Sequence, residues 1–186
     1  VALIGLAGQG EGAAKRSDDY CKPGSGVDMV DTSAIVTDEF LAKMKEIGIT
    51  TIGRYFDYPD ETIEGKRLRP EEPGLIASYG MSLVVVFQHN NNQPETFADW
   101  KNRGPKDAQE ALKLAEQFKM PPNAAIYFGV DGDFVSGQSV AGFHTDEVIG
   151  YFREINRIFA EQDADYPIGV YGSGATCTTL FSEDLA

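Results

Sequence analysis

Short apolar runs alternate with amphipathic stretches along most of the chain, and this alternation predicts its secondary structure. The apolar runs are rich in β-branched and aromatic residues and are bounded by Gly, Pro or Asn, which is typical of strands. The stretches between them place apolar residues at helical spacing. The predicted strands cover residues 26–31, 49–56, 82–88, 123–133 and 166–171, and the predicted helices cover residues 39–47, 70–80, 105–119, 145–161 and 173–186. A strand followed by a helix therefore repeats five times.

This order of elements predicts an α/β fold whose parallel strands are joined by right-handed crossovers. The third strand contains an uninterrupted apolar run from Leu83 to Phe87, which is typical of a strand covered by helices on both faces of its sheet. An eight-stranded (β/α) barrel of the TIM type and an open doubly wound sheet both fit this pattern. The phosphate-loop and dinucleotide-binding fingerprints are missing, and we expect no cofactor.

Polar residues follow each predicted strand at its C-terminal end. In barrel enzymes, this end of the strands carries the catalytic and binding residues. We therefore expect one functional site formed by several strand ends. The candidates are Asp31, Arg54, Tyr55, Gln88, His89, Asp131, Asp133 and Tyr171.

The fourth strand ends in two carboxylates, Asp131 and Asp133, which are separated by one glycine. Side chains two residues apart on a strand point to the same side, and their backbones lie about 6 to 7 Å apart. Like charges at close range push two pKa values apart, so one carboxyl group can be an acid while the other is a base. The spacing therefore indicates a site for acid–base chemistry.

Composition narrows the possible partners. The chain has 186 residues, of which 42% are apolar, so it can bury a core and its length favours one domain. Its 16 basic and 29 acidic residues give a net charge of −13, which argues against binding to nucleic acid or to an anionic membrane surface. No apolar run approaches the roughly 18 residues of a membrane-spanning helix. We expect a soluble protein, and its oligomeric state stays open.

The N-terminal residues 1–22 are predicted to be a flexible arm that precedes the domain. The first sixteen residues begin with an apolar run and become rich in Gly and Ala, so they fit either a flexible arm or the tail of a secretory signal. Cys21 and Cys177 are the two cysteines of the chain, and they could form a disulfide or remain two buried thiols.

Six motifs, in consistent order over about residues 27–180, resemble a known family. They are V-D-T-S at residues 30–33, I-G-R-Y-F at 52–56, V-V-F-Q-H-N-N at 85–91, G-P-K-D-A-Q-E-A-L at 104–112, I-Y-F-G-V-D-G-D at 126–133 and I-G-V-Y-G-S-G at 168–174. The chain is similar to the glycoside-hydrolase-like domains known as domain of unknown function 1906. More distantly, it resembles the family 25 glycoside hydrolases, which are lysozymes that cut peptidoglycan.

The resemblance implies a (β/α)8 barrel with an acidic pocket and an action on a cell-wall or other polysaccharide. The expected partner is thus a carbohydrate polymer, and the expected location is secreted or extracellular. Five strands cannot close an eight-stranded barrel, so we expect residues 23–186 to form a parallel (β/α) TIM-barrel type domain, truncated after about five β/α units. The chain could be a fragment, a partner could complete it, or the sheet could be open.

By position, the resemblance places the first-strand acid at Asp31 and the fourth-strand acids at Asp131 and Asp133. The lysozymes have D-x-E at the fourth strand, whereas this chain has D-G-D, with a side chain one methylene shorter at the second acid. Asp133 is the candidate proton donor. Asp131 and Asp31 are candidates to orient the substrate or to stabilise an oxocarbenium-like centre.

Five further residues are candidates for substrate contact. Arg54 could pair with one of the acids, Asp31 or Asp131, or it could belong to a structural ion pair. Gln88 could contact sugar hydroxyls, and Tyr171 could stack on a sugar ring. Tyr127 could also contact sugar hydroxyls, or it could pack in the core. His89 could bind a ligand or be a polar loop residue.

Three other chemistries compete with glycoside hydrolysis. The acids together with His89 could hold magnesium or calcium for phosphodiester hydrolysis, but the calcium-loop pattern fails at Val135 and Ser136, so we expect no metal. A Cys–His nucleophile needs Cys177 near a histidine, and nothing in the sequence places it there. A barrel without turnover could still bind carbohydrate as a cell-wall-associated module. The shortened second acid fits this last alternative.

Overall fold

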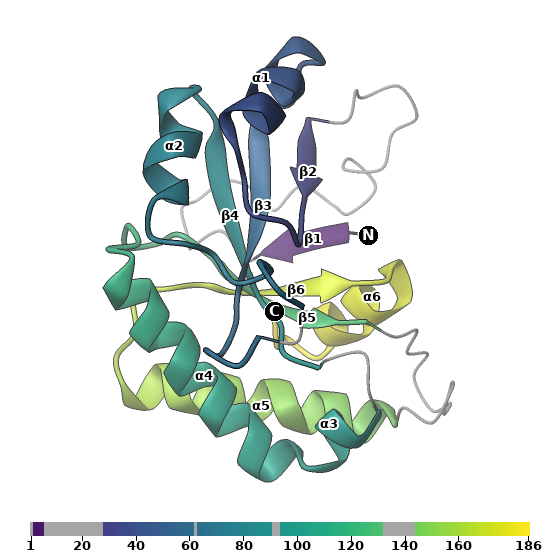
Figure 1. The fold of residues 1–186 in the computed structure, drawn as a ribbon. Coiled ribbons are helices and arrows are strands. Elements are labelled where there is room, and N and C mark those ends of the chain that lie inside the picture. Colours follow the sequence, from purple (N-terminus) through teal and green to yellow (C-terminus); the bar gives the residue numbers. More distant parts are fainter. Residues whose placement is uncertain (1, 6–27, 62, 91–93, 132–143) are drawn as a thin grey trace, which may run out of the picture.

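Five parallel strands wind in one direction and curl into half a barrel (Figure 1). The computed structural model describes residues 2–5, 28–61, 63–90, 94–131 and 144–186. The parallel strands are β2 (Met29–Asp31), β3 (Thr51–Phe56), β4 (Ser82–Phe87), β5 (Ile126–Val130) and β6 (Ile168–Gly172). Each pairs with the next strand along the chain, whereas a doubly wound sheet would reverse its strand order. The prediction of a truncated α/β barrel is confirmed.

Helices lie between these strands, as the alternating pattern predicted. They are α1 (Asp38–Glu46), α2 (Glu72–Ser78), α3 (Pro94–Ala98), α4 (Trp100–Gln117), α5 (Thr145–Glu161) and α6 (Gly174–Ser182). The bounds of α5 match the sequence prediction, whereas the short helix α3 was not predicted. Within the part of the chain that the structure describes, no helix has the length and apolar character needed to cross a membrane.

Helix α4 begins before the proline at which we expected it to start. Pro105 lies inside the helix, where it removes one backbone hydrogen bond. Next to it, Gly104 lets α4 approach α5 so closely that an added Cβ would lie 2.9 Å from the carbonyl oxygen of Tyr151. The close packing of the two helices therefore outweighs the local preference of proline for a helix start.

Strand β1 (Ala2–Gly5) pairs antiparallel with β6, at the edge of the sheet. It falls within the predicted arm of residues 1–22, of which the structure describes residues 2–5. The strand covers backbone groups of β6 that would otherwise form an open edge. The division into an arm and a domain stays a prediction.

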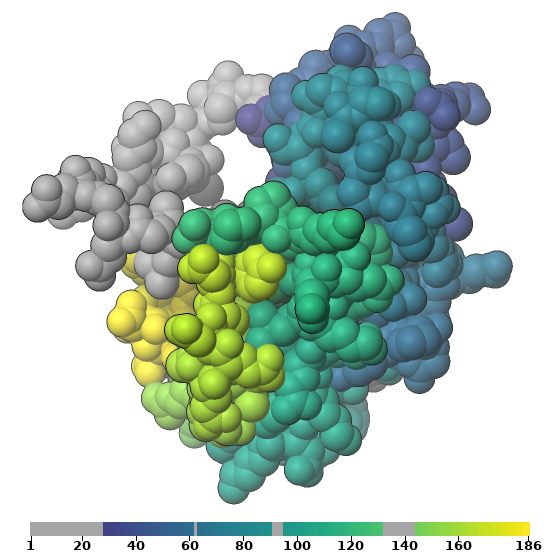
Figure 2. Space-filling view, turned by 90° about the vertical axis from the view of Figure 1, so that its left-hand side faces the viewer, coloured from purple at the N-terminus to yellow at the C-terminus, as the bar shows by residue number. Residues whose placement is uncertain are grey.

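The two faces of the sheet are different. On β5, Ile126, Phe128 and Val130 point to the outer face and belong to a large apolar core that also includes residues of α4 and α5. A second, smaller core lies under α1 and α2, and the two helix pairs sit at opposite ends of the molecule in Figure 1. In the view of Figure 2, the blue elements lie at the upper right of the body and the yellow-green elements at the lower left.

The inner face carries tyrosines and glycines instead. Tyr55, Val86 and Tyr171 form a small buried cluster there, with Tyr127 packed against it. Three glycines on this face, Gly53, Gly129 and Gly169, make room for a side chain of the preceding strand. A Cβ added to them would lie 2.8 Å from Asp31 Cβ, 3.0 Å from Gln88 Cγ and 2.4 Å from Tyr127 Cδ1, respectively.

Candidate functional site

Asp31 ends β2 on the inner face and is held by a tyrosine from the next strand. Its Oδ2 atom accepts a hydrogen bond of 2.6 Å from the hydroxyl of Tyr55. The Tyr55 ring meets Tyr171 edge-on, with the ring centroids 6.4 Å apart and the two hydroxyl oxygens 3.5 Å apart. Burial, followed by the bond to Asp31, raises the pKa of Tyr55. Tyr55 therefore stays a hydrogen-bond donor at any ordinary pH.

Asp131 follows β5 and is held from the neighbouring strand by an amide. Its Oδ2 atom accepts a hydrogen bond of 2.8 Å from Nε2 of Gln88. The Oε1 atom of the same amide accepts a hydrogen bond of 2.9 Å from Nζ of Lys66. A buried cation is thus connected to an exposed carboxylate through one side chain.

Lys66 comes from the loop after β3 and lies almost completely inside, with 5% of its surface exposed. Its Nζ atom sits 4.8 Å above the centre of the Tyr55 ring. Burial lowers the pKa of Lys66, and the negative charges of Asp57 and Asp131 oppose that effect. No feature of the sequence distinguished this lysine from a solvated one.

Asp57 is an acid at a strand end that our sequence analysis missed, although it directly follows Phe56 of β3. Its side chain is completely buried. The Oδ1 atom lies 2.6 Å from Nδ1 of His89 and accepts a hydrogen bond of 2.7 Å from the backbone N–H of Tyr58. The Oδ2 atom is also buried, and it has no hydrogen-bond partner among the described residues.

The structure brings most of the predicted site residues to the inner face or its rim. Asp31, Gln88, Asp131, Tyr127 and Tyr171 lie there, and His89 is nearby through Asp57. Burial raises the pKa of Tyr127 and of Tyr171. Asp133, the candidate proton donor, lies outside the described residues, as do Val135, Ser136 and Cys21. Cys177 is buried in α6.

Arg54 lies on the opposite face of the sheet and is completely buried. Its Nε and Nη2 atoms donate to the two carboxylate oxygens of Glu72, at 2.8 and 3.1 Å. Its Nη1 and Nη2 atoms also donate to the carbonyl oxygens of Thr32 and Gly65, at 2.6 and 2.9 Å. Of the two alternatives that the sequence left open, this geometry matches the structural ion pair.

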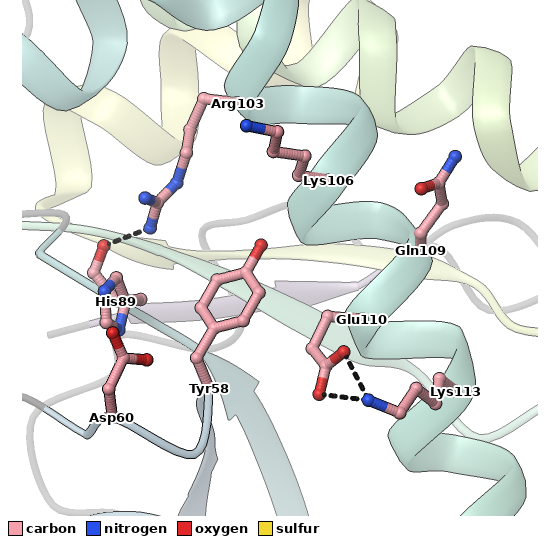
Figure 3. Close-up of a pocket in the computed structure, with 8 residues that line it drawn as sticks. All are labelled: Tyr58, Asp60, His89, Arg103, Lys106, Gln109, Glu110 and Lys113. Atoms are coloured by element: carbon pink, nitrogen blue, oxygen red, sulfur yellow. Dashed lines mark hydrogen bonds and ion pairs between the residues drawn. The ribbon is translucent and has the colours of Figure 1, made fainter.

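A polar groove of about 540 Å³ runs beside the site, between α4 and the loops after β3 and β4 (Figure 3). Arg103 reaches from α4 to donate to the carbonyl oxygen of His89 at 2.7 Å, and it lies 5.6 Å from the centre of the Tyr58 ring. The lining residues are Tyr58, Asp60, His89, Arg103, Lys106, Gln109, Glu110 and Lys113. Planar polar side chains next to an aromatic ring can bind hydroxyl-rich ligands.

A buried carboxylate, Asp107, holds the wall of this groove in place. It accepts hydrogen bonds of 2.8 Å from the hydroxyls of Tyr58 and Tyr151 and one of 2.9 Å from Nε of Arg103. Burial raises the pKa of Asp107, whereas the nearby Arg103 lowers it. Asp107 belongs to the G-P-K-D-A-Q-E-A-L motif, which therefore has a structural role at the groove.

Within the described residues, no three His, Cys, Asp or Glu side chains are grouped so that they could hold a metal ion. Carboxylates, an amide, a lysine and tyrosines instead meet at the open end of a half-barrel. The strand order and these side chains define an α/β half-barrel with acids at its strand ends.

Comparison with known proteins shows the family. Residues 42–186 match the family described as Rv2525c-like, glycoside hydrolase-like domain, and the chain belongs to this family. It is 30% identical over 155 residues to the uncharacterized protein YbfG of Bacillus subtilis (strain 168), an alignment that covers 79% of this chain and 20% of YbfG. The chain spans 20% and 26% of the length of the two curated Bacillus subtilis relatives that it matches.

Two solved structures share the fold. The Mycobacterium tuberculosis Tat-secreted protein Rv2525c, crystallised in complex with HEPES, is 19% identical with a TM-score of 0.62, over 84% of this chain and 73% of that chain. The modular autolysin LytC of Streptococcus pneumoniae is 13% identical with a TM-score of 0.52, over 84% of this chain and 35% of that chain. The predicted family is thus confirmed, and its fold is shared with an autolysin.

Proposed function

We propose that this domain hydrolyses a glycan of the cell wall, with carboxylates at the strand ends as its acid and base. The observation that carries the proposal is the pair Asp31 and Asp131. They come from different strands, lie on one face, and each accepts a hydrogen bond from a neighbouring strand, at 2.6 and 2.8 Å. Fixed carboxylates of this kind suit the stabilisation of an oxocarbenium-like centre.

The proton donor in this proposal is Asp133, because Asp31 and Asp131 already act as acceptors. A general acid must give its proton to the leaving oxygen, and a carboxylate held by donors is better suited to orient the substrate or activate water. Tyr171 and Tyr127 would contact the sugar from the inner face. Family membership supports the proposal, and so does the fold shared with an autolysin.

A location outside the cytoplasm belongs to the same proposal. It is supported by two proteins of the same fold, one of which is Tat-secreted and the other an autolysin. A cell-wall glycan is found only outside the membrane, so a hydrolase of such a glycan must be exported.

Release of reducing ends from purified peptidoglycan and from chitin-like oligosaccharides tests the proposal. Asp131→Asn and Asp133→Asn should each lower release by at least about a hundredfold, because each removes a charge or proton that the transition state needs. Glu116→Gln, an exposed carboxylate on α4, is the matched control and should keep full release. Unchanged release in both aspartate variants would remove this site from consideration.

The groove of Figure 3 favours a second candidate function, a carbohydrate-binding module without turnover. Its Lys106 and Gln109 are exposed and belong to α4, whereas Asp31 and Asp131 lie at strand ends. If the domain only binds, Lys106→Ala together with Gln109→Ala should weaken glycan binding about tenfold, while Asp131→Asn should not. The opposite order of effects, measured by calorimetric titration with peptidoglycan fragments, would favour the hydrolase.

A further inference from the structure

We propose that Lys66 is a positioning residue that sets the orientation of the Asp131 carboxylate through the side-chain amide of Gln88. The inference deepens the proposed function, since it concerns the carboxylate on which that function rests. The arrangement itself consists of one buried cation, one bridging amide and two acids, all within the described residues.

The direction of the Gln88 amide follows from Lys66. An ammonium group can only donate hydrogen bonds, so the atom that faces Lys66 at 2.9 Å must be the amide oxygen. The amide nitrogen then points the other way and donates to Asp131 at 2.8 Å. Without the lysine, either end of the amide can face the carboxylate, and an amide oxygen there would repel it.

Packing holds Gln88 in this bridging position. Its side chain is 5% exposed and crosses over Gly129 of β5, where an added Cβ would lie 3.0 Å from Gln88 Cγ. Because Gly129 has no side chain, the Gln88 side chain can extend across it from the end of β4 to the end of β5. Since both ends of the amide are engaged, the carboxylate of Asp131 is oriented by a nearly immobile donor.

The charges around Lys66 explain why a cation is stable in this place. Tyr55 covers it from β3, Gln88 meets it from β4, and the two acids Asp57 and Asp131 act on it from the ends of β3 and β5. Asp57 is completely buried, and its Oδ2 atom has no hydrogen-bond partner among the described residues. His89 Nδ1 lies 2.6 Å from the other oxygen of this carboxylate, and the charge of Asp57 in turn raises the pKa of Lys66, against the effect of burial.

The NMR signals of the Gln88 side-chain amide and of the Asp131 carboxyl carbon, recorded at one fixed pH on the whole chain, test the coupling without requiring turnover. Lys66→Met and Gln88→Leu remove the cation and the amide, respectively. Lys66→Met should shift or broaden the Gln88 amide signals, because nothing then holds the amide oxygen away from the carboxylate. Both variants should change the chemical shift of the Asp131 carboxyl carbon, whereas Lys66→Arg, which keeps the charge and a donor, should keep most of the natural signal.

Lys45→Met is the matched control, because Lys45 is exposed on α1 and should leave both signals unchanged. If cleavage is present, Lys66→Met should lower kcat at least tenfold with little change in KM. An Asp131 signal that does not change in folded Lys66→Met and Gln88→Leu overturns the inference. A changed signal in a chain that cleaves no glycan would instead leave the positioning role standing and reject the proposed hydrolase.

Discussion

Two buried cations lie on opposite faces of the same half-barrel, and they are neutralised in different ways. Arg54 on the outer face meets Glu72 with two of its nitrogen atoms, and the side chains of both residues are completely buried. Lys66 on the inner face has one side-chain hydrogen bond among those that the structure describes, to Gln88, and the chain of contacts continues to the exposed Asp131. One network is closed inside the protein, whereas the other leads to solvent.

The difference teaches that the role of a buried cation depends on the face of the sheet on which it lies, and not on its residue type. The donors of Arg54 tie β3 to α2 and to two loops through Glu72, Thr32 and Gly65, so the pair serves the fold. The contacts of Lys66 end at a carboxylate that a ligand can reach. Both residues lie in or after the second predicted strand, but only Arg54 was a candidate, and only the tertiary structure separates their roles.

Breaking the buried ion pair of Arg54 and Glu72 should have the largest effect on stability. Arg54→Met leaves Glu72 buried without its counter-charge and should lower the free energy of unfolding by about 3 to 5 kcal/mol. Urea unfolding followed by circular dichroism measures this loss. The double variant Arg54→Met/Glu72→Met should recover much of it, since no uncompensated charge remains. A loss below about 1 kcal/mol in the single variant would mean that the pair resembles an exposed ion pair in energy.

Filling the space under the Gln88 amide should disturb the contacts from Lys66 through Gln88 to Asp131. The loss of stability should be smaller than in Arg54→Met. In Gly129→Ala, the added methyl group meets Gln88 Cγ at 3.0 Å and Gln88 Cβ at 3.1 Å. We expect a loss of about 1 to 3 kcal/mol by overpacking. The NMR signal of the Asp131 carboxyl carbon should change as it does in Gln88→Leu.

Gly74→Ala is the control for this variant, because a Cβ at that position of α2 would have nothing within 4 Å. It should be neutral or slightly stabilising, since alanine is the better helix former. Equal losses in the two glycine variants, measured by the same unfolding experiment, would show that space under Gln88 is not the cause.

The smallest effect concerns the pH dependence of stability. Burial lowers the pKa of Lys66 from its ordinary 10.5, so the unfolded chain binds more protons than the folded chain between the two values. Stability contributed by this group therefore rises with pH through that window, by at most ~1.4 kcal/mol per pH unit. Below the folded pKa, the cost of burying the charge is present in full.

Comparing the natural chain with Lys66→Met isolates the contribution of Lys66 to the pH dependence of stability. The free energy of unfolding of the natural chain, minus that of the variant, should increase as the pH is raised from 8 to 10.5. The titration of the tyrosines occurs in both proteins and largely cancels in the difference. A difference that stays flat or falls with pH would contradict the burial of a charged Lys66.

Much of the fold could be predicted from local patterns. The apolar residues of α5 recur at helical spacing between a polar start and a polar end, and its predicted bounds of 145–161 are those of the structure. Side chains alternate along β5, so Tyr127 packs against the inner cluster, whereas Ile126 and Phe128 belong to the large outer core. The start of α4 was wrong, because Gly104 packs against α5 and keeps Pro105 within the helix.

The candidate site could be predicted only in part. Strand ends carry Asp31, Gln88 and Asp131, and the parallel order of the strands brings them to one edge of the sheet. Asp57 had the same signal, an acid directly after a strand, and could have been found. Lys66 had no signal, because its place under Gln88 depends on the path of the loop between β3 and α2.

The sequence by itself determined the parallel α/β order, the acidic strand ends and the family, because these depend on periodicity and on residues close together along the chain. Only the tertiary structure decided which charges meet. Arg54 pairs with Glu72, and Lys66 is linked to Asp131 through Gln88. Such pairings join residues that are far apart in sequence, and they are set by which face of a strand is buried and how closely glycines let neighbouring strands approach.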